Sequence, residues 1–195
     1  MTRRLVPLIF AAALLAGCGG GDHRYARDDL AKVVLRPSEP PTGLLYWRLQ
    51  SGPNMLEKEG QESAAGLRIL RPLGFRGDYG SQFVPRSRSA PVQYAESFAV
   101  LFRDENGARK AVAIFKRRQR RSGHGVRELD ASGLGDDSWA LRGVFFPGSP
   151  PTFFYIWRRA NLMIGFALAG KAGAVTEAET RAYARRRDDR AEEAA

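Results

Sequence analysis

The sequence contains one cysteine, two histidines and no apolar run long enough to form a membrane-spanning helix. A single thiol excludes an intramolecular disulfide. Two isolated histidines, His23 and His124, with no further cysteine argue against a zinc site. The longest apolar run, residues 5–16, has twelve residues, whereas a spanning helix needs about 20. The chain therefore lacks the commonest frameworks for metal binding and membrane crossing.

Motifs for catalysis are missing as well. No serine lies in a G-x-S-x-G turn, and "GLGDD" (133–137) lacks the following Lys-Ser/Thr of a phosphate-binding loop. Apolar residues follow Asp136 and Asp137 too closely for a calcium loop. We expect Asp136 to bond backbone amides of a turn instead. The sequence predicts a protein that is not an enzyme and has no cofactor or metal.

The first residues are arranged like a secretory signal, with Arg3 and Arg4, then the apolar run 5–16, then small residues. The pair of arginines also faintly resembles a twin-arginine export signal, but the charged region is very short. We therefore favour general secretion. Residues 1–17 are expected to be removed and to play no part in the fold.

The end of this segment is similar to a bacterial lipobox, because Leu15, Ala16 and Gly17 precede Cys18. In such sequences the cysteine thiol takes up a lipid, the chain is cut before it, and the new amine is acylated. Small residues at 16 and 17 let the peptidase approach. The alternative is an ordinary secretory signal with an incidental cysteine.

Lipidation of Cys18 predicts a location. Two or more acyl chains, palmitate among them, anchor a protein stably in a membrane. We expect residues 18–28 to form the lipidated cysteine and a flexible tether, and residues 29–195 to form one domain. The domain would lie at the extracytoplasmic face of the cell membrane. In a bacterium with two membranes, Gly19 in place of aspartate would favour the outer membrane.

The net charge is +10, and 26 of the 31 basic residues are arginine. Nucleic acid is a common partner of such a charge, but an exported lipoprotein rarely meets it, so we predict no nucleic-acid binding. A basic surface also suits an anionic leaflet. One run of cations follows an amphipathic helix pattern: Lys116, Arg117, Arg118, Arg120 and Arg121. A solvated helix end is the favoured interpretation, and contact with an anionic surface is the alternative.

Hydrophobic periodicity and cap signals divide the chain into helices and strands. Helices are expected over residues 27–35, 54–70, 105–121 and 177–195. Strands are expected over residues 44–52, 77–85, 91–102, 126–132, 138–146, 152–158 and 162–170, with 77–85 as a short edge strand. This order predicts an α+β fold with a single antiparallel sheet, formed mostly by the second half, and about three flanking helices.

Aromatic residues gather in the strands of the second half, where neighbours along a strand must point to opposite faces. They are Phe145, Phe146, Phe153, Phe154, Tyr155, Trp157 and Phe166. We expect one face to be core and the other to lie under a helix. An exposed aromatic groove for a lipid, glycan or peptide is the alternative.

Four features together resemble a known group of proteins: "AVLFRDENGARKAV", the "LGDDSW" turn, the hairpin at "WRRAN" and the charged last helix. They resemble small actinobacterial-type surface lipoproteins and, more distantly, extracellular sensor-like domains of mycobacterial kinases and the PsbP/Mog1-like architecture. The resemblance implies an antiparallel sheet with flanking helices and supplies no catalytic residues. Related hairpins often have glycine where this chain has Ala160.

The combined features predict a membrane-anchored, non-catalytic binding or interaction module at the cell surface. Its partner would be an unknown protein, cell-wall or lipid ligand, besides the membrane that holds the lipid on Cys18. The alternatives are a carrier of a small apolar ligand and an enzyme of unrecognised type.

Overall fold

The computed structural model describes residues 24–58, 61–145 and 148–195. The predicted signal peptide, Cys18, His23 and Phe146 lie outside the described residues. Ordered packing is already present at Tyr25, which is buried. The stretch assigned to the tether therefore includes residues that pack against the domain.

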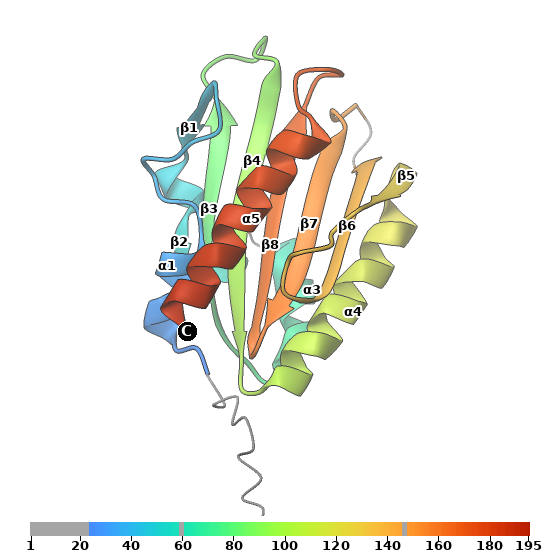
Figure 1. Cartoon of the computed structure of the whole chain (residues 1–195). Coiled ribbons are helices and arrows are strands. Elements are labelled where there is room, and N and C mark those ends of the chain that lie inside the picture. The colour runs from blue at the N-terminus through green and yellow to red at the C-terminus, as the bar shows by residue number, and fades with distance from the viewer. Residues whose placement is uncertain (1–23, 59–60, 146–147) are drawn as a thin grey trace, which may run out of the picture.

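An eight-stranded antiparallel sheet forms the centre of the fold, in the order β1-β3-β4-β8-β7-β6-β5, with β2 also paired to β3 (Figure 1). The strands are β1 (Leu44–Tyr46), β2 (Gly52–Pro53), β3 (Phe75–Pro85), β4 (Val92–Phe102), β5 (His124–Leu129), β6 (Asp136–Val144), β7 (Thr152–Arg159) and β8 (Leu162–Gly170). This confirms the α+β class with one antiparallel sheet. The sheet takes strands from both halves of the chain, whereas the second half was expected to supply most of them.

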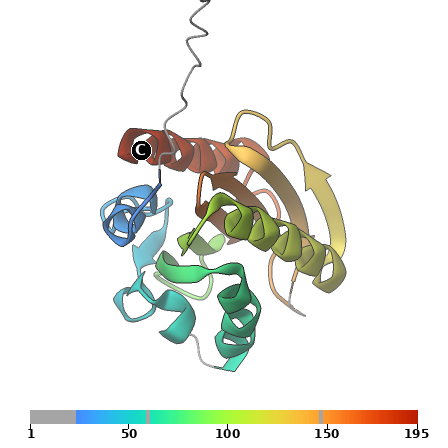
Figure 2. The same ribbon diagram turned by 90° about the horizontal axis from the view of Figure 1, so that it is seen from below.

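Helices cover both faces of the sheet (Figure 2). One face carries α1 (Leu30–Val33) and α5 (Glu177–Ala194), and the other carries α2 (Met55–Lys58), α3 (Gln61–Leu70) and α4 (Glu105–Ser122). The 3₁₀ turns are η1 (Arg27–Asp29), η2 (Arg48–Gln50) and η3 (Arg71–Leu73). Helix is found in all four ranges where it was expected. In the range 27–35 it is η1 followed by the single turn α1, and the range 54–70 begins with the single turn α2 before α3.

Side-chain caps begin both long helices, α4 and α5. The Asp104 carboxylate accepts from the N–H of Gly107 at 2.9 Å, and the Thr176 hydroxyl accepts from the N–H of Glu179 at 3.1 Å. Each bond satisfies a backbone donor that the first turn leaves open. These two residues therefore fix where α4 and α5 start.

Side chains of the central strands point alternately to the two faces of the sheet, and each face has its own part of the hydrophobic core. In β4, Ala99 and Leu101 pack on the α5 side, while Phe98, Val100 and Phe102 pack on the α4 side. The aromatic residues of the second half follow the same rule. Those that the structure describes are buried or half-buried, so helix cover on both faces is confirmed, and these described residues form no exposed aromatic groove.

The strand expected at the edge is an interior strand. β3 has 11 residues and pairs with β4 on one side and with β1 and β2 on the other. A Cβ at Gly80 would lie 2.0 Å from the Met55 sulfur, so glycine lets α2 pack directly on β3. The strand expected over residues 44–52 is interrupted by η2, and only β1 and the first residue of β2 are strand.

The two-residue turn between β7 and β8 joins distant parts of the chain. The Asn161 side-chain oxygen accepts from the N–H of Tyr25 at 2.9 Å, and its amide nitrogen donates to the carbonyls of Tyr25 and Phe102 at 3.2 and 3.0 Å. The Tyr25 hydroxyl donates to the carbonyl of Ala191 in α5 at 2.7 Å. The start of the described chain is thus bonded to the turn and to the C-terminal helix, and Asn161 also bonds the turn to the end of β4.

Arg158 lies beside this turn, and its side chain is only 8% exposed. It pairs with Asp137 at 2.7 Å, Asp136 at 3.1 Å and Glu105 at 2.8 Å. The two aspartates of "LGDDSW" thus bind a guanidinium across the sheet, a role that differs from the expected bonds to turn amides. The ion pairs tie the start of β6 and the start of α4 to the end of β7.

Arg159 makes the corresponding contact on the other face. It binds both carboxylate oxygens of Asp188 at 2.7 Å and pairs with Glu192 at 2.6 Å. The Asp188 side chain is 4% exposed, so this bidentate pair is shielded from water and holds the last turns of α5 on the β7–β8 hairpin. The hydrogen bond to Asp188 raises the pKa of Arg159.

Arg187 also lies in the core, but unlike Arg158 and Arg159 it forms no ion pair with a carboxylate among the described residues. Arg187 on α5 is fully buried, donates to the Ser97 hydroxyl at 2.7 Å and stacks 4.6 Å from the Phe166 ring centroid. Burial lowers the pKa of Arg187. Ser97 also accepts from the N–H of Leu35 at 3.1 Å. One hydroxyl therefore links β4, α5 and the segment after α1.

Replacing Ala160 with glycine should stabilise the protein. Ala160 has φ +45°, in the left-handed region that costs a residue with a Cβ about 1–2 kcal/mol. After the entropic cost of glycine, Ala160→Gly should raise the free energy of unfolding by about 0.5–1 kcal/mol in urea titrations. Ala113→Gly, on the exposed side of α4, is the matched control and should lower it by about 1 kcal/mol. A lower free energy of unfolding in Ala160→Gly would show that the backbone at Ala160 is not strained.

Replacing Tyr155 with phenylalanine should change how stability depends on pH. The Tyr155 hydroxyl is buried with no hydrogen-bond partner in the described structure, and burial raises the pKa of Tyr155 to about 12 from 10. The unfolded chain therefore loses this proton first as pH rises. The wild type should lose about 2–3 kcal/mol of stability between pH 10 and pH 12 through this group.

Tyr155→Phe should remove that part of the loss and leave stability at pH 7 unchanged or slightly higher. Urea titrations of both proteins at pH 7, 10 and 12 measure the difference. Identical pH profiles would show that the hydroxyl has the same pKa in the folded and unfolded chains.

Candidate functional site

The basic helix end singled out in the sequence divides into two groups. Lys116 and Arg120 lie over the Trp139 ring, 5.6 and 5.7 Å from its centroid, and Arg120 pairs with Glu128. The hydrogen bond from Arg120 lowers the pKa of Glu128. Two of the cations thus pack α4 against β5 and β6. The others are exposed: Arg117, Arg118 and Arg121. Their contact with an anionic surface stays a prediction.

The remaining candidates do not meet in one place. His124 is exposed at the start of β5, and Asp136 and Asp137 are engaged by Arg158. Within residues 24–58, 61–145 and 148–195, no group of three histidine, cysteine or acidic side chains is placed to hold a metal ion.

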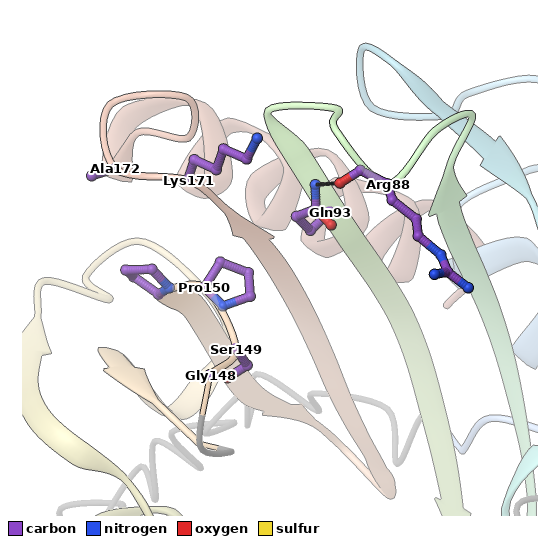
Figure 3. Close-up of a pocket in the computed structure, with 8 residues that line it drawn as sticks. Arg88, Gln93, Gly148, Ser149, Pro150, Lys171 and Ala172 are labelled. Atoms are coloured by element: carbon purple, nitrogen blue, oxygen red, sulfur yellow. Dashed lines mark hydrogen bonds between the residues drawn. The ribbon is translucent and has the colours of Figure 1, made fainter.

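An open hollow of about 360 Å³ lies where three loops meet at one end of the sheet (Figure 3). The loops follow β3, precede β7 and follow β8. The lining residues are Arg88, Gln93, Gly148, Ser149, Pro150, Pro151, Lys171 and Ala172. Arg88 and Lys171 are the two cations of this lining. In Figure 3 the Arg88 side chain extends away from Pro150, and the Lys171 side chain extends toward the loop that carries Arg88.

Hydrogen bonds between the loops hold the hollow open. The N–H of Lys171 donates to the carbonyl of Pro91 at 2.8 Å, and its ammonium donates to the carbonyl of Ser89 at 2.8 Å. The N–H of Gly170 donates to the carbonyl of Pro151 at 3.3 Å. The Gln93 amide donates to the carbonyl of Arg88 at 3.4 Å. The loops are therefore fixed to one another and to the strand ends, and the prolines limit their backbone freedom.

The chemistry of the hollow favours binding. An ammonium has three donors, and Ser89 takes one of those of Lys171. Pro150 and Pro151 add apolar surface to the lining. The described lining contains no carboxylate, histidine or cysteine, so these residues provide no acid–base pair of the usual kind for catalysis.

The hollow lies at the end of the sheet opposite the β7–β8 turn. Val92 and Gly170 pair near the hollow, whereas Leu101 and Leu162 pair near the turn. Between these ends β4 has 11 residues, which at ~3.3 Å each is about 35 Å. Figure 1 shows the three loops at the top and the first described residues at the bottom.

The sequence leaves residues 147–151 as a connection between two expected strands but does not predict this site. A hollow formed by three loops depends on the strand order, and the order was not assigned from the sequence. The pairing of β4 with β8 brings Lys171 beside the loop that follows β3.

A second exposed feature lies at the β1 edge. Leu45, Trp47 and Leu49 are 44%, 38% and 80% exposed. Leu45 lies in β1, Leu49 lies in η2 and Trp47 lies between them, so these three exposed apolar residues form a short apolar strip of sequence at the rim of the sheet. Apolar strips of this kind are common at contacts with other proteins.

Comparison with known proteins gives a likeness in fold. No protein-family model matches the sequence, and no curated protein matches it. The structure is similar to the extracellular domain of PknH from Mycobacterium tuberculosis, with a TM-score of 0.52 and 12% sequence identity. The match covers 87% of this chain and 99% of that domain. The predicted resemblance to extracellular domains of mycobacterial kinases is thus confirmed for the fold.

None of the helices in the described part of the chain is long and apolar enough to cross a membrane.

Proposed function

We propose that this protein is a lipoprotein, held by a lipid on Cys18 at the extracytoplasmic face of the cell membrane, whose single domain is a non-catalytic binding module. The main support is the arrangement of the chain. Tyr25 is bonded into the β7–β8 turn, seven peptide steps after Cys18. The loop hollow lies at the opposite end of the sheet, where a ligand outside the membrane reaches it.

The fold agrees with this role. The extracellular domain of PknH has the same architecture at 12% identity, and a kinase's extracellular domain is itself distinct from its catalytic part. Fold likeness alone does not carry function between proteins. The proposal therefore depends on the lipobox of this sequence and on the geometry of its hollow.

The chemistry of the hollow suits a ligand with a negatively charged group beside a compact apolar part. Lys171 provides the cation, and Pro150 and Pro151 provide apolar contact. The hollow lies between loops, outside the layers of sheet and helix, and it is open to solvent. That position favours an exposed ligand over an apolar molecule enclosed in the core.

Anchoring is tested by metabolic labelling with a fatty acid that carries an alkyne. The wild-type protein should take up the label, and Cys18→Ala should lose it completely because the chain has no second thiol. Mass spectrometry of the mature protein should find an acylated cysteine as the first residue. A wild-type protein without label, or with an N-terminus other than Cys18, would contradict the proposal.

Ligand binding is tested by native purification followed by mass spectrometry of bound small molecules. Lys171→Gln should lower ligand occupancy by at least about tenfold, since a hydrogen bond to a charged group contributes ~1.5 kcal/mol or more. Lys110→Gln, which removes an exposed charge from α4, is the matched control and should retain the ligand. Equal occupancy in both variants, or no ligand on any of the proteins, would reject the hollow as the binding site.

A further inference from the structure

Five exposed arginines surround the point at which the chain joins the domain. We call them the arginine cluster: Arg24, Arg27, Arg71, Arg76 and Arg103. They come from four segments, namely the first described residues, η3, the start of β3 and the connection between β4 and α4. Segments far apart in the sequence thus bring their cations to the same end of the sheet.

Backbone contacts show that these segments are neighbours. The Arg27 guanidinium donates to the carbonyl of Arg76 through two nitrogens, at 2.9 and 2.6 Å. The N–H of Arg103 donates to the carbonyl of Gly74 at 2.7 Å, and the N–H of Gly74 donates to the carbonyl of Arg71 at 3.0 Å. The cluster is therefore part of the rigid fold.

Most carboxylates at this end are engaged elsewhere. Glu105, Asp136 and Asp137 pair with Arg158, and Asp188 and Glu192 pair with Arg159.

Asp104 caps α4 and pairs with Arg103 at 3.2 Å. The N–H of Gly107, the Arg103 side chain and the charge of Arg24 lower the pKa of Asp104. Among the described residues, no acid forms an ion pair with Arg24, Arg71 or Arg76. Asp28 is exposed on the same N-terminal segment, and the neighbouring Asp29 pairs with Lys32. The five arginines thus lie beside two carboxylates, Asp28 and Asp104, that form no ion pair with a described cation outside the cluster.

The short distance to Cys18 allows the cluster to reach the membrane. Seven peptide steps separate Cys18 from Tyr25, and an extended chain spans at most ~3.6 Å per residue, or about 25 Å. The basic end of α4 is farther away. That helix starts beside Arg103 and has 18 residues, so its last turn lies about 27 Å along the helix from the cluster. Electrostatic attraction to a surface fades over ~8–10 Å, so the arginine cluster is the better-placed group.

We propose that the arginine cluster docks this end of the domain on the anionic phospholipid headgroups of the leaflet that holds the lipid. The inference rests on the proposed lipid anchor and adds an orientation to it. Guanidinium groups bind phosphate through paired hydrogen bonds, and each surface cation strengthens attachment to an anionic leaflet about fivefold. Docking would hold the sheet upright, with the loop hollow pointing away from the membrane.

The test uses the full lipidated protein in vesicles of phosphatidylcholine, alone or mixed with phosphatidylglycerol. Amide hydrogen exchange is measured over residues 71–77 and over the β4–α4 connection. Exchange there should slow severalfold on the anionic vesicles, and high salt should abolish the difference.

Two triple variants with the same change in charge identify the surface that docks. Arg24, Arg71 and Arg76 changed together to glutamine should lose the slowing on anionic vesicles. Arg117, Arg118 and Arg121 changed together to glutamine should keep it. Unchanged exchange in the central strands β4 and β8 confirms that each variant is folded.

Equal exchange on both kinds of vesicle would overturn the docking proposal, as would loss of the slowing in the α4 variant alone. The mass of the N-terminal peptide from the same preparation reports on the anchor separately. An unlipidated N-terminus would reject the proposed function, and the docking inference with it. A lipidated protein without slowed exchange would reject docking alone.

Discussion

The hydrogen bonds of Asn161 determine how the two ends of the chain are held. Its side chain satisfies backbone groups of Tyr25 and Phe102 that are buried from water, and leaving such groups unpaired costs about 1–3 kcal/mol each. The same turn carries Arg158 and Arg159, which bind carboxylates on opposite faces of the sheet. The first described residues, β4, α4 and α5 therefore form one rigid unit. Both proposals above depend on that rigidity, because it fixes the direction in which the chain leaves the domain.

Much of the fold was predictable because its signals are local. The apolar alternation of β4, β7 and β8 sets their two faces, and Asp104 and Thr176 mark helix starts through bonds to residues three positions away. The partners of Arg158 and Arg159 were not predictable, since the nearest of these carboxylates in sequence is 21 positions away. β3 was expected at an edge because Pro85 closes it, and the sequence does not show that β1 and β2 pair with it. Among the candidate site residues, Lys116 and Arg120 pack over the ring of Trp139. This role was not predictable either, because it depends on how α4 lies against β6.

Arg187 shows how the core makes use of a charged residue. A fully buried guanidinium without a carboxylate is expensive to desolvate, and here stacking on Phe166 and the bond to Ser97 offset part of that cost. The bond to Ser97 forms only when α5 lies in one position along the sheet. Hydrophobic contacts alone would tolerate small shifts of the helix, so this single hydroxyl gives α5 a defined register. The same hydroxyl holds the backbone of Leu35, and the N-terminal and C-terminal segments are thus positioned by one atom.

The direction of the strands has a mechanical consequence. The loop hollow and Tyr25 lie at opposite ends of the sheet, so a pull between them acts along the strands. The hydrogen bonds between antiparallel strands run across that direction, and a lengthwise pull loads many of them together. A pull across the sheet would open them one after another. The fold therefore presents its loops on a scaffold that resists extension between its two ends, a property suited to a domain that is tethered at one end and gripped at the other.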